Sequence, residues 1–420
     1  MKIQKRIYLD HAAATYMDKR VESAMKPFWS ITFGNPSSVY TEGREAKAAV
    51  SQARERVARI LGCRPDEIIF TGGGTEGDNM AVLGVARHYK KQGHTYRQAG
   101  NHVVVSAVEH EAVLNSCEAL KKEGFEITFI KPGKDGVINP KDVEAALKPE
   151  TILVSIMYAN NEIGTIQPIP EIARIIGNFR KKKTIGQSLV PGSLGAVLPL
   201  FHTDAVQVPL YLDLNVQKLG VDLMTLNGSK IYGPKGSGAL YVRRGVKIEP
   251  IIYGGGQEMK IRPGTESVAG IIGFSRSLEL AAEGRGKEAV RLSVLRDYFI
   301  KKITEKIPEI IINGSLEKRL PNNVNISVMG VEGESAVLYL DDKGVSCSTG
   351  SACSSDSLEP SHVIKALGVP DEYAHGSLRF SMGKATQKKD MDYVLKVLPE
   401  IVERLRSISA LDTRAYKIRR

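Results

Sequence analysis

Cysteine is scarce in this chain of 420 residues, and long apolar runs are absent. The four cysteines are Cys63, Cys117, Cys347 and Cys353, and no two of them form a CxxC pair. A zinc site or a thioredoxin-like motif is therefore not expected, and a chain of this length needs no disulfide scaffold. The first ten residues lack the apolar stretch of a signal peptide, and no window approaches about 20 apolar residues. These absences favour a reducing cytoplasm, and no membrane partner is expected.

The charge balance is basic, because 58 Lys and Arg residues face 47 Asp and Glu residues, a net charge of +11 at pH 7. The charge is spread along the chain, and the densest run, residues 180–183, is predicted to be a solvated surface loop. Residues 183–200 are rich in Gly, Pro and Ser and are also predicted to be a surface loop. A basic surface favours anionic partners such as acidic carrier proteins or tRNA. The charge alone does not choose between them, and no direct nucleic-acid partner is expected.

Short apolar runs alternate with segments of helical periodicity over the first two thirds of the chain. Strands are predicted at residues 68–70, 102–106, 126–130, 152–158, 201–204, 223–226 and 239–242. A helix is predicted where Ala46, Val50, Ala53 and Val57 recur every three or four residues, with Gly62 as its stop. This alternation predicts an α/β fold with a mostly parallel sheet. A ligand in such a fold lies beyond the carboxyl ends of the strands.

The pattern changes from about residue 285. A long polar helix is predicted at 287–306, strands at 324–328 and 377–381, and a closing helix at 389–406. We therefore predict a large domain over residues 16–285 and a smaller α+β domain over 286–420, which carries the loop of Cys353. Residues 1–15 are expected to join the smaller domain.

Two charged residues could hold a cofactor. Lys230 stands just after a predicted strand, among small residues, and a lysine that forms a Schiff base needs such a tight pocket, with a pKa below the usual ~10.4. An isolated lysine is, however, far more often a solvated surface group. Asp204 ends an apolar strand 26 residues earlier and could keep a pyridine nitrogen protonated. Alternatively, Asp204 is a helix N-cap, with Gln207 completing a capping box.

Two further motifs follow predicted strands. Residues 71–76, Thr-Gly-Gly-Gly-Thr-Glu, open a predicted helix over 76–89, and a hydroxyl group at a helix N-terminus makes a phosphate cradle. A plain strand-to-helix turn explains the same residues equally well. His110 could stack on a cofactor ring and transfer protons near neutral pH. A single histidine is more often a buried polar group with an ordinary partner.

Cys353 lies in a run of small and hydroxyl residues, 346–355, which predicts an accessible segment. A free cysteine is usually buried among apolar residues, and the sequence around Cys353 offers no such cover. Cys347 is closer to an apolar segment, and packing is expected for Cys63 and Cys117 in their helical patterns. Each signal alone is ambiguous, but lysine, aspartate, histidine, phosphate turn and exposed cysteine occur together.

Together these residues resemble the cysteine desulfurases of the NifS/IscS type, in the class V aminotransferase family of fold type I pyridoxal-phosphate (PLP) enzymes. The similarity runs from residues 8–15 to residues 377–381. The loop Ser-Thr-Gly-Ser-Ala-Cys at 348–353, followed by Leu-Glu-Pro-Ser-His at 358–362, is specific for the long-loop subgroup. The resemblance implies a homodimeric PLP transferase that converts L-cysteine to L-alanine and a Cys353 persulfide. The sulfur would go to an iron–sulfur scaffold or another acceptor protein, or serve tRNA or cofactor thiolation.

The resemblance also assigns roles to single residues. Lys230 would bind PLP covalently and move the substrate Cα proton, and His110 would stack on the ring and act as acid or base. The other cofactor contacts would be Asp204 at the ring nitrogen, Gln207 and Asn161 at the ring hydroxyl, and Thr75, backbone Gly74 and the neighbouring subunit's Thr265 at the phosphate. Arg379 would hold the substrate carboxylate, with Asn35 and Asn161 nearby.

Two positions depart from the family pattern. A serine and a histidine, both phosphate ligands, usually stand where this chain has Asn227 and Ser229. The side chains present can still donate hydrogen bonds, so we expect the phosphate to be held with less positive charge. Residues 181–200 are also longer than the usual link in the family.

Two other functions are compatible with the motifs. A selenocysteine lyase or another class V activity is the alternative within the family, and a non-catalytic assembly partner is the alternative outside it. The Cys353 loop argues against a plain transaminase, which needs no protein thiol. The presence of Lys230, Asp204 and His110 argues against a non-catalytic role.

Overall fold

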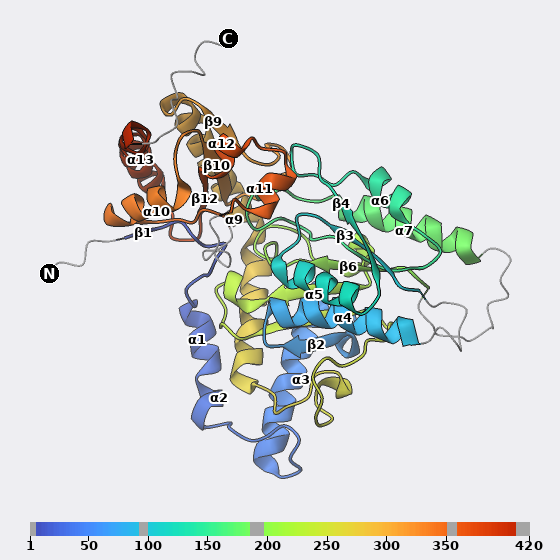
Figure 1. Cartoon of the computed structure of the whole chain (residues 1–420). Helices are drawn as coiled ribbons and strands as arrows, with labels where there is room; N and C mark the ends of the chain where they lie inside the picture. Colours follow the sequence, from blue (N-terminus) through green and yellow to red (C-terminus); the bar gives the residue numbers. More distant parts are fainter. Residues whose placement is uncertain (1–5, 92–99, 185–196, 351–358, 409–420) are drawn as a thin grey trace.

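The computed structural model describes residues 6–91, 100–184, 197–350 and 359–408. Cys353 and residues 185–196, most of the second predicted surface loop, lie outside these ranges. Figure 1 shows a central sheet enclosed by helices, with the C-terminal elements gathered at one end and the N-terminal strand beside them. Among the described residues, no helix combines the length and apolar character needed to cross a membrane.

A seven-stranded sheet forms the centre, in the order β2-β8-β7-β6-β5-β3-β4. Its strands are β2 (Ile68–Thr71), β3 (His102–Ser106), β4 (Glu126–Ile130), β5 (Thr151–Ser155), β6 (Leu200–Asp204), β7 (Leu223–Asn227) and β8 (Gly238–Val242). All pairs from β7 to β4 are parallel, and β8 is antiparallel to both of its neighbours. The predicted mostly parallel sheet is confirmed, and each of the seven predicted strands is present.

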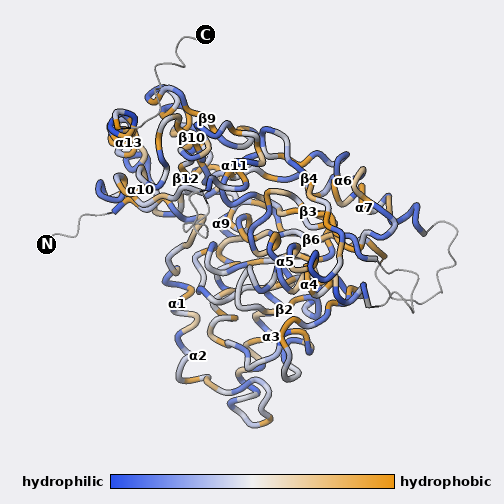
Figure 2. Tube along the Cα trace, in the orientation of Figure 1, coloured by the Kyte–Doolittle hydropathy of each residue, from blue (hydrophilic) through white to orange (hydrophobic). Residues whose placement is uncertain are grey.

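Alternate residues of the central strands enter two separate hydrophobic cores. In β3, Val104 packs in the core that contains residues of α3 (Thr41–Leu61), α7 (Ile169–Thr184) and α9 (Val268–Lys306). Val103 and Val105 pack in the other core, with α4 (Gly74–Lys91) and α5 (Glu111–Lys122). Strands covered on both faces carry near-continuous apolar residues, and Figure 2 shows this hydrophobic colouring in the region of β3. The short α6 (Pro140–Ala146) and α8 (Val216–Leu219) also contact α7.

The helices were predicted with unequal success. α3 is confirmed, with its apolar stripe buried and with Gly62, at φ 69°, in the left-handed conformation that ends it. α9 begins at Val268 rather than at residue 287. Its first half is apolar and packs against α3 and α1 (Lys19–Met25), so it lacks the polar pattern by which the second half was recognised. The predicted domain division at 285/286 falls inside this continuous helix and stays a prediction.

The basic run at residues 180–183 is the last turn of α7, so the prediction of a loop was wrong. Arg180 forms an ion pair with the buried Asp222 and donates hydrogen bonds to the Pro199 carbonyl at 2.6 and 2.8 Å. The partners lie 19 and 42 residues further along the chain. A local pattern cannot show such pairing.

The C-terminal elements form a second, antiparallel sheet in the order β12-β10-β9. Its strands are β9 (Ile310–Ile312), β10 (Asn323–Val328) and β12 (Ser377–Ser381), and α10 (Gly333–Asp342) and α13 (Lys388–Ile408) pack against each other nearby. The two predicted strands and the closing helix are confirmed. β1 (Ile7–Tyr8) pairs in parallel with β11 (Val345–Ser346), so the start of the chain lies beside these elements. The remaining short helices are α2 (Pro27–Ser30), α11 (His362–Ala366) and α12 (Asp371–Ala374).

Candidate active site

A cavity of about 210 Å³ lies at the edge of the sheet where β3, β5, β6 and β7 end. The lining residues are Ala12, Ala13, Gly74, Thr75, Asp78, His110, Met157, Asn161, Asp204, Val206, Gln207, Asn227, Lys230 and Arg379. Most of them follow the carboxyl ends of parallel strands, the position expected for a ligand in this kind of sheet. The structure thus brings most of the predicted site residues together around one space.

Lys230 is fixed from both sides. It follows β7 in a single turn of 3₁₀-helix. Asn227 caps this turn, because its Oδ1 accepts a hydrogen bond from Ser229 N–H at 3.0 Å. The amine of Lys230 donates to the carbonyl of Ala13. Thr15 donates both its N–H and its hydroxyl to the Ser229 carbonyl, each at 2.9 Å. The N-terminal segment therefore closes over the turn that carries the lysine.

Asp204 ends β6 with 6% of its surface exposed. Its Oδ1 accepts a hydrogen bond from Val206 N–H at 2.8 Å. No helix follows, so the alternative that Asp204 is a helix N-cap is wrong. Burial raises the pKa of Asp204, while the charges of His110 and Lys230 and the Val206 N–H act in the opposite direction. A buried carboxylate opposite a lysine suits a cationic group of a ligand.

His110 has an ordinary partner and also forms a wall of the cavity. Its Nδ1 accepts a hydrogen bond from Ala112 N–H at 3.1 Å, which caps the N-terminus of α5. Because Nδ1 is the acceptor, the ring proton of the neutral histidine is assigned to Nε2. The capping bond holds the imidazole ring of His110 in place. The Nε2–H group of the ring remains available to donate a hydrogen bond.

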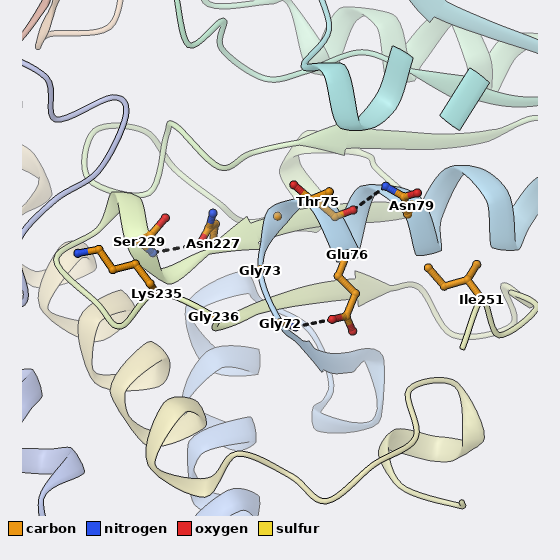
Figure 3. Close-up of a pocket in the computed structure, with 11 residues that line it drawn as sticks. Gly72, Gly73, Thr75, Glu76, Asn79, Asn227, Ser229, Lys235, Gly236 and Ile251 are labelled. Atoms are coloured by element: carbon orange, nitrogen blue, oxygen red, sulfur yellow. Dashed lines mark hydrogen bonds between the residues drawn. The ribbon is translucent and has the colours of Figure 1, made fainter. Parts of the chain in front are cut away.

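A second cavity, of about 520 Å³, shares Gly74, Thr75 and Asn227 with the first. Figure 3 shows the glycine turn leading into α4, with Ser229 and Lys235 across from it. The free N–H groups at the start of a helix favour an anion. A Cβ on Gly74 would lie 3.0 Å from Val206 Cγ2, so glycine keeps this approach open.

Glu76 fixes the glycine turn. Its Oε2 accepts from Gly72 N–H at 2.9 Å, and its Oε1 accepts from Arg262 Nε at 2.9 Å. The turn is therefore more than a plain strand-to-helix connection, because its backbone is held beside a cavity. Both departures from the family pattern, Asn227 and Ser229, line this cradle.

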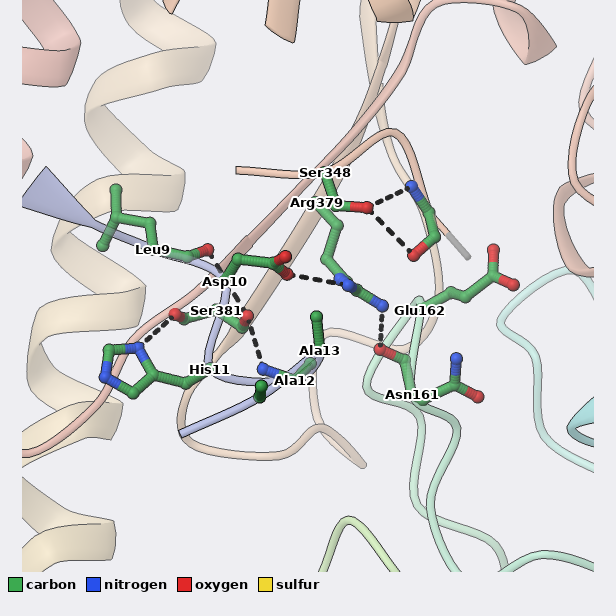
Figure 4. Close-up of polar contacts among 12 residues, drawn as sticks. Leu9, Asp10, His11, Ala12, Ala13, Asn161, Glu162, Ser348, Arg379 and Ser381 are labelled. Atoms are coloured by element: carbon green, nitrogen blue, oxygen red, sulfur yellow. Dashed lines mark hydrogen bonds and ion pairs between the residues drawn. The ribbon is translucent and has the colours of Figure 1, made fainter. Parts of the chain in front are cut away.

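Arg379 reaches the first cavity from β12 with 1% of its surface exposed. Figure 4 shows its guanidinium between Asp10 and Asn161. Nη2 donates to the Asp10 carboxylate at 2.8 Å and Nη1 to the Asn161 carbonyl at 3.1 Å. Nε has no hydrogen-bond partner among the described residues. Since a buried donor without a partner is costly, this group favours an anionic ligand.

Three predicted site residues, Asn35, Thr265 and Cys353, lie elsewhere or are not described. Asn35 and Thr265 are exposed, and neither lines the two cavities of this chain. Cys347 is buried beside β11, and burial raises its pKa to about 12. Burial likewise raises the pKa of Cys63 and of Cys117 to about 12, as expected for packed thiols. Cys353 is outside the described residues.

Two acidic residues at the site were not found from the sequence. Asp78 of α4 is 1% exposed and lines the first cavity, and Glu109 is fully buried next to His110. An acid inside a helix is usually solvated, which hid Asp78. The available signal was the apolar run that follows it at residues 80–83, because that run places this part of the helix in the core.

Comparisons with known proteins agree with this geometry. The family model of aminotransferase class V matches residues 7–186 and 193–394. The cysteine desulfurase IscS of Dictyoglomus turgidum is 50% identical over 407 residues, which cover 97% of each chain. Among solved structures, a NifS-like protein is 34% identical, with a TM-score of 0.84 over 95% of this chain and 100% of the other. SspA, solved in complex with cysteine, is 34% identical, with a TM-score of 0.75 over 90% and 99%.

The fold, the arrangement of the cavity and the length of these matches agree. Both the class V model and the IscS relative extend over nearly the whole chain, including the C-terminal elements. The chain belongs to the aminotransferase class V family and, within it, to the cysteine desulfurases, which are PLP-dependent enzymes.

Proposed function

We propose that this chain binds PLP across the two adjacent cavities and uses it to take sulfur from L-cysteine, leaving L-alanine and a persulfide on Cys353. One observation carries the proposal: Lys230 and Asp204 line a single cavity that shares Gly74, Thr75 and Asn227 with the glycine cradle at the start of α4. An amine, a buried carboxylate and an anion site in this order match the aldehyde, ring nitrogen and phosphate of PLP. SspA, a relative with cysteine bound, supports the same substrate.

The residues present fit the cofactor. Asp204 would face the ring nitrogen, the fixed ring of His110 would stack on the cofactor ring, and Gln207 and Asn161 would contact the ring hydroxyl. Gly74 and Thr75 would hold the phosphate, together with Asn227 and Ser229 and with the neighbouring subunit's Thr265. When bound, PLP supplies an electron sink that stabilises negative charge at the substrate Cα.

The side chains of this chain then have defined tasks. Arg379, whose guanidinium is held by Asp10, would bind the substrate carboxylate, with Asn35 and Asn161 nearby. The amine of Lys230 would take the Cα proton, and Nε2–H of His110 would act as an acid. The Cys353 thiolate would attack the substrate sulfur, so that an S–S bond forms and the Cβ–S bond breaks. The electron pair of that bond and protons from the site complete the methyl group of alanine.

The surface supports self-association and a protein acceptor. Several large apolar side chains that precede the Thr265 turn in the sequence are exposed, among them Ile31, Phe33, Val39 and Tyr253. We propose that this surface is covered in a homodimer that shares its sites through Thr265. The net charge of +11 favours an acidic acceptor such as an iron–sulfur scaffold protein, in the cytoplasm.

The test is the purified protein with PLP and L-cysteine. We expect a yellow protein that releases alanine and, with a thiol reductant, sulfide in equal amounts. Lys230→Ala should lose the visible band of lysine-bound PLP and the activity, whereas the exposed Lys218→Ala should keep both. A colourless protein without sulfide release would instead support the non-catalytic alternative. A normal visible band in Lys230→Ala would contradict the assignment of the lysine.

A further inference from the structure

A cluster of buried ionisable residues lies behind the first cavity. Asp78 of α4, Glu109 after β3, and His202 and Asp204 of β6 are all at most 6% exposed. Asp78 and Asp204 both line the cavity. Asp204 is proposed to contact the ring nitrogen of PLP. The number of protons that this cluster holds therefore decides whether a negative charge faces that nitrogen.

The histidine of the cluster is neutral. Nδ1 of His202 bonds the Ser155 hydroxyl at 2.8 Å, and Nε2 bonds the Thr225 hydroxyl at 3.0 Å. Burial lowers the pKa of His202 to about 3. Nε2 lies 3.7 Å from Oδ1 of Asp78, but a neutral imidazole supplies no charge to compensate a carboxylate there.

The three carboxyl groups differ in what surrounds them. Asp204 accepts the Val206 N–H, and the positive charge of Lys230 favours its ionised form. Oδ1 of Asp78 has no hydrogen-bond partner among the described atoms, and its other neighbours are the Thr225 hydroxyl and the two acids Asp204 and Glu109. Among the three described carboxyl groups, only Asp204 therefore has a nearby cation that stabilises its charged form.

Glu109 is separate from this pair in its bonding. Its Oε1 accepts Met157 N–H at 2.7 Å, and its Oε2 has no partner among the described residues. Burial and the charge of Asp204 raise its pKa well above the usual value. Burial, Asp204 and Glu109 raise the pKa of Asp78 in the same way.

We propose that Asp78 and Asp204 act as one unit that carries one proton and one negative charge, with Asp204 ionised toward the cavity and Asp78 as the neutral positioning residue behind it. The inference rests on the proposed PLP site for its purpose, but the proton itself is a property of the protein. Two neighbouring carboxylates in a buried site cannot both be ionised without a large cost. Because Asp78 keeps its proton, the charge of Asp204 is not opposed and remains available to a protonated ring nitrogen.

The first test needs neither cofactor nor substitution. Infrared spectra of the apo-protein at pH 7.5, with and without ¹³C-labelled aspartate, report a protonated aspartic acid by an isotope-shifted carboxylic-acid band. We expect one such band in the wild type. A carboxylic-acid band that does not shift when aspartate is labelled would belong to Glu109. The absence of any aspartate band would show that Asp78 is ionised and would overturn the proposal.

The variants identify the residue. Asp78→Asn should remove the aspartate band, while Glu109→Gln should remove only the band that labelling leaves in place. Loss of the aspartate band in Asp204→Asn but not in Asp78→Asn would reverse the roles of the pair and refute the assignment. Since these spectra are taken on apo-protein, they stand even if PLP binding is disproved.

The PLP-bound protein gives the second readout, a pH titration of its visible absorbance. Asparagine resembles the neutral acid in charge, so Asp78→Asn should retain PLP with a midpoint within about half a pH unit of the wild type. Asp204→Asn, which removes the charge, should lower PLP affinity at least about tenfold. A midpoint shift of about one unit or more in Asp78→Asn would mean that Asp78 is charged.

Discussion

The guanidinium of Arg379 and the carboxylate of Asp10 form an ion pair of 2.8 Å that links β12 to the segment after β1. The side chain of Arg379 is 2% exposed and that of Asp10 is 17% exposed. The pair orients the guanidinium, whose buried Nε has no hydrogen-bond partner among the described residues. If Arg379 holds the substrate carboxylate as proposed, the substrate site is assembled from the first and last parts of the chain.

Arg379→Lys keeps the charge but removes the planar set of donors. We expect KM for L-cysteine to rise about 10- to 100-fold, equivalent to the loss of one charge-assisted hydrogen bond, with a smaller change in kcat. Steady-state sulfide release measures both constants. The exposed Arg59→Lys on α3 is the control. An unchanged KM in Arg379→Lys would remove this residue from substrate binding.

The two C-terminal cysteines should behave differently. With a pKa of about 12, fewer than about one in a thousand Cys347 side chains is a thiolate at neutral pH, and the thiolate is the nucleophile. Cys347→Ser should therefore keep most activity. Cys353→Ser should still bind PLP and cysteine but release no sulfide. Mass spectrometry of the persulfide checks the assignment, and a persulfide on Cys347 would disprove it.

Ser229→His should tighten PLP binding. Ser229 lines the cradle, and a histidine there could add a charge-assisted hydrogen bond to the phosphate, worth about 1.5–3 kcal/mol. Dialysis against a PLP scavenger should then remove the cofactor at least about tenfold more slowly. Ser51→His on the exposed face of α3 is the matched control. Equal retention in both variants would show that another group already compensates the phosphate charge.

Burial of His202 should make the free energy of unfolding decrease as the pH falls. Its pKa is lowered to about 3 in the folded protein, against about 6.5 when unfolded. Between these values the unfolded chain binds more protons, so this contribution is complete above pH 6.5 and is lost as the pH falls toward 3. The buried acids act oppositely, because their raised pKa values favour the folded state at low pH.

The difference between wild type and His202→Gln isolates the histidine. When the pH falls from 6.5 to 4, the free energy of unfolding of the apo-protein, measured with urea, should decrease by about 3 kcal/mol more in the wild type than in the variant. The exposed His375→Gln should follow the wild type. Parallel curves for wild type and His202→Gln would mean that the buried imidazole is already protonated.

A shared site can be tested by mixing two inactive proteins. Thr265→Ala and Lys230→Ala should each be weak or inactive alone. If the partner subunit supplies Thr265, exchanged heterodimers contain one intact site, and the mixture should recover about a quarter of wild-type activity. Sedimentation should show twice the chain mass of 45.9 kDa. A monomer, or no recovery after exchange, would contradict the shared site.

Local sequence patterns were sufficient to predict those elements whose structure depends mainly on their own residues. The strands were predicted because their residues are apolar on both faces, and α3 because its stripe and Gly62 agree. Lys230, Asp204 and His110 were found because each follows a strand that ends at the same edge of the sheet.

The errors arose where distant residues decide the structure. The charge of Arg180 is paired by Asp222, and the start of α9 is defined by packing against α3. Asp78 looks like any acid on a helix until the sheet buries it. The roles of Asn35 and Thr265 depend on a second chain or a bound ligand and stay predictions.

α9 has a mechanical consequence for the whole molecule. Its 39 residues span about 58 Å at 1.5 Å per residue, from α3 at one end to β10 and α13 at the other. Any shift of the C-terminal sheet must tilt or flex this rod, because no loop interrupts it. Gly284 and Gly286 stand near its midpoint, where an added Cβ would meet nothing within 4 Å. Each glycine weakens the helix by about 1 kcal/mol relative to alanine. We therefore expect α9 to bend most easily near its midpoint, between the central sheet and the arginine that is proposed to hold the substrate.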